Sequence, residues 1–256
     1  MSDIEFHKEG HVAFVRLNRP KSLNAISDSM DLALHAAWNE VNNDPDIWVA
    51  VLSAEGERAF CVGADVAGGT ERSSRMALAG GLTGVGGPLV TLTKPLIAAL
   101  QGYVLGGGFE LAMCADIIVA ADSALFAVPE TKAGIIGECG VLHRAVRQLP
   151  QRVAMAMILT GDRLPASDAL KYGLVNEVVP FADLEAATSR WTAKVLAASP
   201  LANQAAKHAA NHGLTLSLNA ALGTRYEPIE SYADSGDRLE GRLAFQEKRL
   251  PQWAGK

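Results

Sequence analysis

Three consecutive glycines interrupt the most apolar part of the chain, in the segment GYVLGGGFELAMCAD at residues 102–116. Glycine has no side chain to pack and loses more conformational freedom on folding than any other residue, so such a run needs another reason. Two interpretations are open. Either the backbone approaches a ligand closely there, or the glycines form a turn into a buried helix whose start is capped by Glu110.

In the first interpretation a helix begins near Gly107, and its first N–H groups have no acceptor within the helix. These donors lie at the positive end of the helix dipole, where they would stabilise a carbonyl oxygen that gains negative charge. Glu110 follows in the first turn, so a titratable carboxyl group lies beside the same place. This interpretation predicts an oxyanion site with an acid or base next to it.

Composition narrows the class of protein. With 256 residues, 49% of them hydrophobic, the chain can bury a large core. A net charge of −5 argues against broad nucleic-acid binding, and charged residues interrupt every apolar stretch before it could span a bilayer. The charged start lacks the apolar segment of a signal peptide. The cysteines match no zinc pattern and no complete disulfide pairing, which favours a reducing cytoplasm and no metal: Cys61, Cys114 and Cys139.

Apolar runs bounded by turn residues alternate with helical patterns over the first 180 residues, as in an α/β fold. Strands are expected at 11–17, 47–54, the start of 59–69, 95–105, 117–121, 124–128 and 175–180. Helices are expected after Ser27, which can cap the first of them, and from Gly107, then at 141–149, 152–161 and 166–173.

The character of the chain changes after Phe181. The remainder is rich in alanine, periodic and almost free of strand formers, and Pro200 and Pro228 divide it into several helices. We therefore expect an α/β core with the site at 1–195 and a helical region at 196–256. Residues 70–94 have little pattern, and a loop or short helix beside the site is expected there.

Two glycine turns follow apolar strands, Gly63-Ala64-Asp65 and Gly106-Gly107-Gly108, and each can offer a backbone N–H to one oxygen. Two carboxylic acids, Glu110 and Glu130, stand at comparable strand ends. Taken alone, either glutamate is more readily explained as a surface residue. A joint match of both turns and both acids to one known family would favour a catalytic role for them instead.

The same residues carry a resemblance to a known family. The stretches NRPKSLNA, FCVGADV, GYVLGGGFELAMCAD, PETKAGI, LTGDRLPASDALKYGLVNEVV and LEGRLAFQEKR together resemble the crotonase, or enoyl-CoA hydratase/isomerase, family along essentially the whole chain. The resemblance implies a spiral of ββα units with a C-terminal helical region that assembles homotrimers, commonly stacked as dimers of trimers. It also implies an acyl thioester of coenzyme A as substrate, with no metal or redox cofactor.

Site roles follow from that resemblance. The N–H groups of Ala64 and Gly107 correspond to an oxyanion hole for the thioester carbonyl, Glu110 to the activator of water, and Glu130 to the donor of a proton to C2. Asp65 itself is expected mainly as a turn and capping residue. The positions that resemble the family's CoA and substrate contacts are Lys21, Leu23, Ala25, Asp65, Val66, Gly106, Phe245 and Lys248.

Glu138 departs from the pattern of many hydratases, which carry a proline-glycine-rich turn at this point. Dienoyl-CoA isomerases of the family place a catalytic carboxylate here, and carnitinyl-CoA dehydratases have an acidic residue in the same turn. Glu138 is therefore a third acid/base, a contact for a polar acyl group, or a cap for the helix that starts at Val141. The leading hypothesis is hydration of a trans-2-enoyl-CoA. Carnitinyl-CoA dehydration or double-bond isomerisation is the alternative, and a catalytically silent CoA-binding or RNA-binding protein is a remote one.

Overall fold

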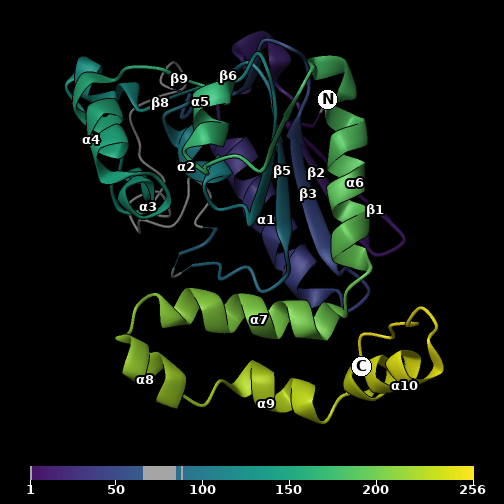
Figure 1. Cartoon of the computed structure of the whole chain (residues 1–256). Coiled ribbons are helices and arrows are strands. Elements are labelled where there is room, and N and C mark those ends of the chain that lie inside the picture. The colour runs from purple at the N-terminus through teal and green to yellow at the C-terminus, as the bar shows by residue number, and fades with distance from the viewer. Residues whose placement is uncertain (1, 66–84, 88) are drawn as a thin grey trace.

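The strands of the protein fall into two sheets in the computed structural model, which describes residues 2–65, 85–87 and 89–256 (Figure 1). Within these residues the larger sheet has the order β1-β2-β3-β5-β7-β10. It is parallel except for β1, which pairs antiparallel with β2. Its strands are β1 Ile4–Glu9, β2 Val12–Leu17, β3 Val49–Ala54, β5 Leu96–Leu100, β7 Ile117–Ala121 and β10 Glu177–Val179.

The smaller sheet takes one strand from each successive unit of the chain. Among the described residues its order is β4-β6-β8-β9, so β3, β5 and β7 of the larger sheet are each followed by a strand of the smaller one. This alternation agrees with the spiral of ββα units that the family resemblance implied. The strands are β4 Ala59–Cys61, β6 Tyr103–Leu105, β8 Leu125–Ala127 and β9 Leu164–Pro165.

The prediction of a single strand at 95–105 is wrong, because the chain turns at Gln101-Gly102 and continues in the other sheet. Gly102 has φ +55°, and a Cβ atom there would lie 2.2 Å from the carbonyl oxygen of Arg58. Only glycine fits this corner. The continuous apolar run concealed the break, because both halves are buried.

The first strand, β1, was not expected from the sequence. Half of its residues IEFHKE are charged, and all except Ile4 are exposed, so no long apolar pattern marks it. The register with β2 pairs Ile4 with Leu17 and Glu9 with Val12. An edge strand needs a partner on one side only, and its charged side chains suit an exposed edge.

Helices cover both faces of the larger sheet. Helix α1 (Asp28–Asn43) buries Met30, Leu34 and Trp38 in the main core, and Ser27 caps it by accepting a hydrogen bond from the amide of Met30 (3.2 Å), as predicted. Helix α6 (Leu184–Leu196) lies on the opposite face (Figure 1). The strands of this sheet bury residues on both faces, which explains their uninterrupted apolar runs.

Shorter helices surround the smaller sheet and carry the glycine-rich segment. They are α2 Gly107–Ala112, α3 Val141–Gln148, α4 Gln151–Thr160 and α5 Ala166–Lys171, with short 3₁₀ turns at Pro20–Ser22, Pro129–Ala133 and Phe181–Asp183. All four α-helices were expected. Gly161 ends α4 in a left-handed conformation, as is common for a glycine at a helix C-terminus.

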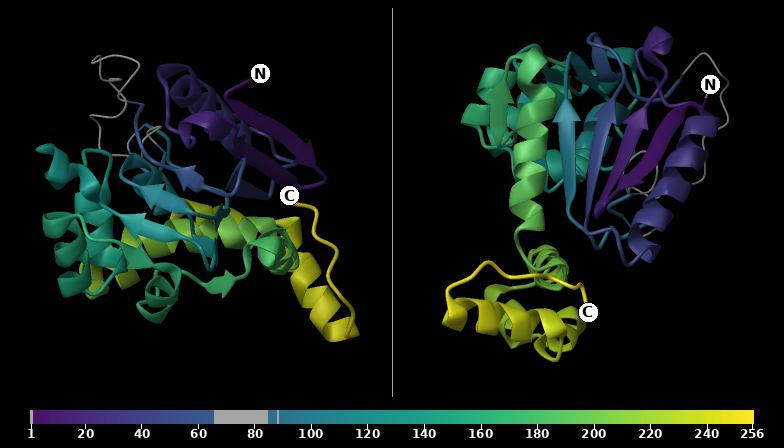
Figure 2. Two further views of the ribbon diagram at one scale, coloured as in Figure 1. Left: turned by 90° about the horizontal axis from the view of Figure 1, so that it is seen from above. Right: turned by 90° about the vertical axis from the view of Figure 1, so that its right-hand side faces the viewer.

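The last four helices form a separate layer below the sheets (Figure 2). Pro200 and Pro228 lie in the first turns of two of them, where a missing N–H costs nothing. The helices are α7 Pro200–Gly213, α8 Leu218–Gly223, α9 Glu227–Ala233 and α10 Gly236–Glu247.

Candidate active site

The two glycine turns expected from the sequence lie against each other. A Cβ atom on Gly63, which has φ +97°, would lie 3.0 Å from the amide nitrogen of Gly107. A Cβ atom on Gly108 would lie 2.3 Å from the carbonyl oxygen of Cys61. The turn after β4 and the start of α2 therefore approach more closely than side chains at these positions would allow.

The bridge that holds the first turn does not use the N–H of Ala64. The amide of Ile26 donates to the carbonyl of Gly63 (2.8 Å), and the amide of Asp65 donates to the carbonyl of Ile26 (2.9 Å). Successive amides of an extended chain point in opposite directions, so the amide of Ala64 points away from Ile26. Gly107 begins α2, where amides have no intrahelical acceptor. Two backbone donors thus stand on adjoining turns.

Glu110 is buried, with 2% of its surface exposed. Its Oε1 accepts hydrogen bonds from the amides of Cys139 (2.9 Å) and Val141 (3.0 Å) at the start of α3. Burial raises the pKa of Glu110, while these amides and the positive charge of Arg144 oppose the rise. The carboxylate is held in one orientation and is a stronger base than an exposed glutamate.

Glu130 lies in the 3₁₀ turn that follows β8, close to the start of α2. A Cβ atom on Gly106 would lie 2.9 Å from Oε1 of Glu130. Burial, with a smaller contribution from the nearby charge of Glu110, raises the pKa of Glu130 to about 7. Its buried Oε2 accepts no hydrogen bond from any residue that the structure describes. This carboxyl group can hold a proton at neutral pH and direct an oxygen at a ligand.

Both carboxyl groups lie close to Gly137. A Cβ atom on Gly137 would lie 3.1 Å from Oε1 of Glu110 and 3.7 Å from Oε1 of Glu130. Gly137 comes from the turn before α3, so elements from three parts of the chain meet here. The sequence placed the two acids at comparable strand ends, and the structure brings them together.

Glu138 is half-buried in the turn between Gly137 and α3, and its charge acts on Cys139. The helix cap position is Gly140, and Cys139 and Val141 donate their amides to Glu110. Glu110 therefore occupies the place at the start of α3 that the sequence had offered to Glu138. A role for Glu138 as a third acid/base or an acyl contact stays a prediction.

The loop expected to contact CoA lies next to the Ala64 turn. Lys21 is exposed, Leu23 is half-buried and has φ +51°, and Ala25 is buried. Asp65 forms an ion pair with Arg19 across 2.9 Å, which fits the expectation of a turn residue. Val66, another expected contact, lies outside the described residues, as do 70–84 and 88 of the poorly patterned region at 70–94.

Sequence reasoning missed Arg19 and the fully buried Asn24, which both hold this loop. Asn24 donates from Nδ2 to the carbonyls of Glu55 (3.0 Å) and Ala59 (2.9 Å). No local signal marked them, because an asparagine and an arginine before a proline are ordinary residues of a loop. Their long-range partners could not be read from the chain order.

Phe245 and Lys248 are not brought to the two glutamates. Phe245 is 86% exposed on α10, and Lys248 ends the same helix, far from α2 in Figure 1. In the described structure, Phe245 and Lys248 therefore lie away from the place where the glutamates of the same subunit would meet a ligand. Their expected role at CoA would require a second subunit.

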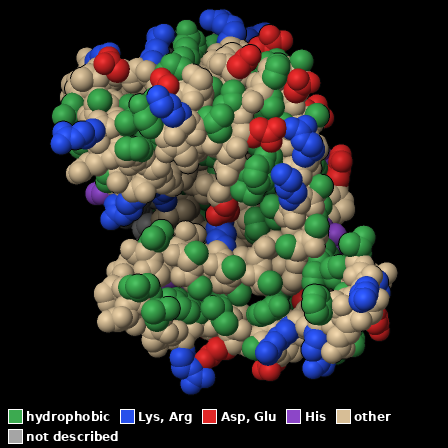
Figure 3. Space-filling view, viewed as in Figure 1, with side chains coloured by type: hydrophobic (Ala, Val, Ile, Leu, Met, Phe, Trp, Pro, Cys, Tyr) green, Lys and Arg blue, Asp and Glu red, His purple; other side chains and the backbone are tan. Residues whose placement is uncertain are grey.

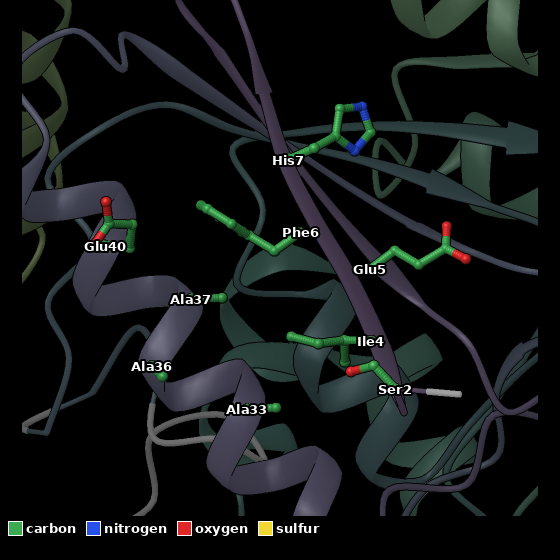
Figure 4. A pocket seen from close by; sticks show the side chains of 9 residues that line it. All are labelled: Ser2, Ile4, Glu5, Phe6, His7, Ala33, Ala36, Ala37 and Glu40. Carbon is green, nitrogen blue, oxygen red and sulfur yellow. The ribbon is translucent and has the colours of Figure 1, made fainter.

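Two hollows of the described structure lie away from the two glutamates. One of about 920 Å³ lies between β1 and α1, with Ile4 and Phe6 on one side and Ala33, Ala36 and Ala37 on the other (Figure 4). Another of about 690 Å³ lies between the larger sheet and α6. Neither touches Glu110 or Glu130. The candidate site is defined instead by the converging backbone turns and carboxyl groups.

Groups of three or more side chains suited to a metal ion do not occur among the described residues. The helices within the same ranges are all too short or too polar to cross a membrane. The chemistry on view consists of carboxyl groups and backbone amides.

Comparison with known proteins agrees with this geometry. Residues 7–256 match the sequence pattern of the family described as enoyl-CoA hydratase/isomerase. The chain belongs to this family. Its resemblance to crotonases and its fold are thereby confirmed, and it is an enzyme of a family that acts on CoA thioesters.

Several family members are similar over nearly their whole length. The (E)-benzylidenesuccinyl-CoA hydratase of Thauera aromatica is 37% identical over 96% of both chains. The carnitinyl-CoA dehydratase of Proteus mirabilis is 36% identical over 96% of both chains. A crystal structure of a candidate short chain enoyl-CoA hydratase from Novosphingobium aromaticivorans is 64% identical, with a TM-score of 0.93, and the match covers 100% of this chain and 99% of that one.

Proposed function

We propose that the protein hydrates the 2,3-double bond of a trans-2-enoyl-CoA, reversibly. The observation that carries this proposal is the pair of carboxyl groups close to Gly137: Glu110 bound by two amides, and Glu130 with its pKa raised to about 7. Addition of water needs one base and one acid at the same time. Two interacting carboxyl groups that share one proton provide both.

In this mechanism the carboxylate of Glu110 removes a proton from water, and the hydroxyl oxygen forms a bond to C3. The electron pair of the double bond moves toward the thioester carbonyl, whose oxygen becomes the oxygen of an enolate. The amides of Ala64 and Gly107 donate to that oxygen, and each such donor contributes roughly 3 kcal/mol to transition-state stability. The enolate then takes the proton of Glu130 at C2, and the product is the 3-hydroxyacyl-CoA.

The reaction is not a net oxidation or reduction, and the chain's own groups supply the acid, the base and the donors to the thioester oxygen. We therefore propose that it uses no metal or redox cofactor, with coenzyme A as part of the substrate. None of the three cysteines forms a disulfide in the structure. The proposed location is the cytoplasm, where thiols stay reduced.

We also propose a homotrimer, or a dimer of trimers, with contacts made by α7–α10. Leu214, Leu218 and Leu222 are 80%, 74% and 77% exposed. Exposed apolar surface of this extent is typical of a protein interface. Assembly would also let Phe245 and Lys248 of one subunit reach the CoA bound to another.

A second candidate, carnitinyl-CoA dehydration, has a specific observation in its favour. Glu138 lies in the turn beside both carboxyl groups, and an acid there suits a cationic acyl chain. The relative from Proteus mirabilis is similar over the whole length. The two glutamates would act in reverse, with Glu130 removing the proton at C2 and Glu110 protonating the departing hydroxyl.

The test is an assay of the purified protein with crotonyl-CoA and with crotonobetainyl-CoA, following the absorbance of the enoyl thioester. We expect faster loss of absorbance with crotonyl-CoA. Preference for crotonobetainyl-CoA, abolished by Glu138→Gln, would establish the second candidate instead. Thioester binding without turnover of either compound would contradict both and favour a silent binding protein.

A further inference from the structure

The side chain of Arg19 joins three separate segments of the chain. Its Nη1 donates to the carbonyl of Ala25 (2.5 Å) and its Nη2 to Oδ2 of Asp65 (2.9 Å). Its Nε lies 3.7 Å from Oδ1 of Asp3, just before β1. A guanidinium holds its donors in one rigid plane, so these contacts fix the relative positions of their partners.

Arg19 is itself held at the backbone. Its amide donates to Oδ1 of Asn24, and the amide of Asn24 donates to the carbonyl of Arg19, both at 2.9 Å. Asn24 is fully buried and is anchored to the carbonyls of Glu55 and Ala59 on either side of the β3–β4 connection. The guanidinium therefore projects from a fixed base.

The two strongest contacts of Arg19 fall on opposite sides of the Ile26–Ala64 bridge. Ala25 precedes Ile26 in the loop, and Asp65 follows Ala64 in the turn. The side chains of Arg19 and Asp65 are 21% and 18% exposed, so solvent screens this ion pair less than it screens one on the open surface. The ion pair and the bridge together determine where the turn stands relative to Gly107.

We propose that Arg19 is a positioning residue for the oxyanion site. Its guanidinium holds the Ala64 turn at the distance from Gly107 at which both amides donate to one thioester oxygen. This inference rests on the proposed function, since it concerns the same carbonyl. Arg19 does not touch the reacting atoms, and it acts through Asp65 and Ala25.

The test replaces Arg19 by methionine, which keeps the length of the side chain and removes its donors. We expect kcat for crotonyl-CoA hydration to fall roughly 30- to 100-fold, because a small misplacement of a donor costs about this much in rate. KM should change less than about threefold. The matched control is Arg16→Met on β2, which removes a more exposed arginine paired with Glu5 and Glu55 and should leave kcat unchanged.

The infrared frequency of a bound thioester carbonyl distinguishes a positioning role of Arg19 from a role in stability alone. The probe is butyryl-CoA labelled with ¹³C at the carbonyl, which has no double bond to hydrate. Donors at the oxygen lower this frequency in the wild type, and we expect a smaller lowering in Arg19→Met. An unchanged frequency in that variant would overturn the inference. No lowering in the wild type would instead show that the oxyanion site of the proposed function is wrong.

Two further variants keep the inference testable if Arg19→Met folds poorly. Arg19→Lys keeps the charge and can make one of the two contacts, so an intermediate loss of about 3- to 10-fold in kcat is expected. Asp65→Asn should lose activity through the same contact, and adding it to Arg19→Lys should cost less than the product of the two single effects. Strictly multiplicative effects, or a fully active Arg19→Lys, would contradict the proposal.

Discussion

The sheet core and the layer of α7–α10 achieve order in different ways. In the core, large side chains such as Trp38, Phe60 and Phe109 have no exposed surface. In the helical layer, Leu222 and Phe245 are 77% and 86% exposed, and hydrophobic side chains gather on its surface (Figure 3). A single copy of the chain completes the first region. The second has an apolar surface that a single copy leaves uncovered.

Hydrogen bonds order the helical layer where apolar packing is sparse. Asp237 is 1% exposed, and its carboxylate accepts from Ser199 Oγ (2.7 Å) and from the amides of Ala254 and Gly255 (3.0 Å each). This buried carboxylate ties the starts of α7 and α10 to the segment after α10. The comparison teaches that the core is completed by its own packing and holds both glutamates, whereas the helical layer leaves apolar side chains exposed.

The largest effect should come from the core. We expect Glu110→Gln to lower kcat for crotonyl-CoA by about a thousandfold, because an amide cannot take a proton from water. The measurement is steady-state kinetics together with mass by light scattering. The assembly should be unchanged, since Glu110 lies inside the core. Near-normal kcat would contradict the two-carboxylate mechanism.

Replacing a glycine by alanine should have different effects on stability in the two regions. Gly108→Ala places a methyl group against the carbonyl of Cys61, which must move, so we expect about 100-fold lower kcat and roughly 1–3 kcal/mol lower stability. Gly223, in α8, has nothing within 4 Å of an added Cβ atom. Gly223→Ala should be neutral or stabilise by less than about 1 kcal/mol. Denaturant unfolding measures both, and similar losses would break the comparison.

Replacing an exposed leucine by glutamate should disrupt assembly only where that leucine lies in the helical layer. Leu222→Glu on α8 should produce monomers in light scattering, because a buried interface would then contain an unpaired charge. The same change at Leu159 on α4, which is 66% exposed, is the control and should leave the mass unchanged. Assembly that survives Leu222→Glu would argue against contacts through this helix.

The smallest effect is a pH-dependent change in stability. Because the folded-state pKa of Glu130 is about 7, above its ordinary value of 4.5, the stability that its proton provides is complete below 4.5 and is lost as pH rises through 7. Glu130→Gln removes that loss. The Tm of the variant minus the Tm of the wild type should therefore be larger at pH 8 than at pH 5 by about 3 °C. Glu185→Gln on the surface of α6 should show no such difference.

The sequence pattern was sufficient to predict most of the helices and strands and the chemical groups of the site. Ser27 and the spacing after it predicted α1, and the glycine run predicted the start of α2. The strand break at Gly102 and the strand β1 were missed for a physical reason. A corner between two buried strands keeps the apolar pattern, and a charged edge strand shows none.

The sequence by itself determined which groups are present: two glycine turns, two glutamates and helices with apolar faces. Only the tertiary structure decided what those groups meet. The amides that hold Glu110 come from 29 and 31 residues further along the chain, and the arginine that holds Asp65 comes from 46 residues before it. Local patterns encode periodicity and turns, whereas such contacts depend on how the strands of two sheets are placed against each other.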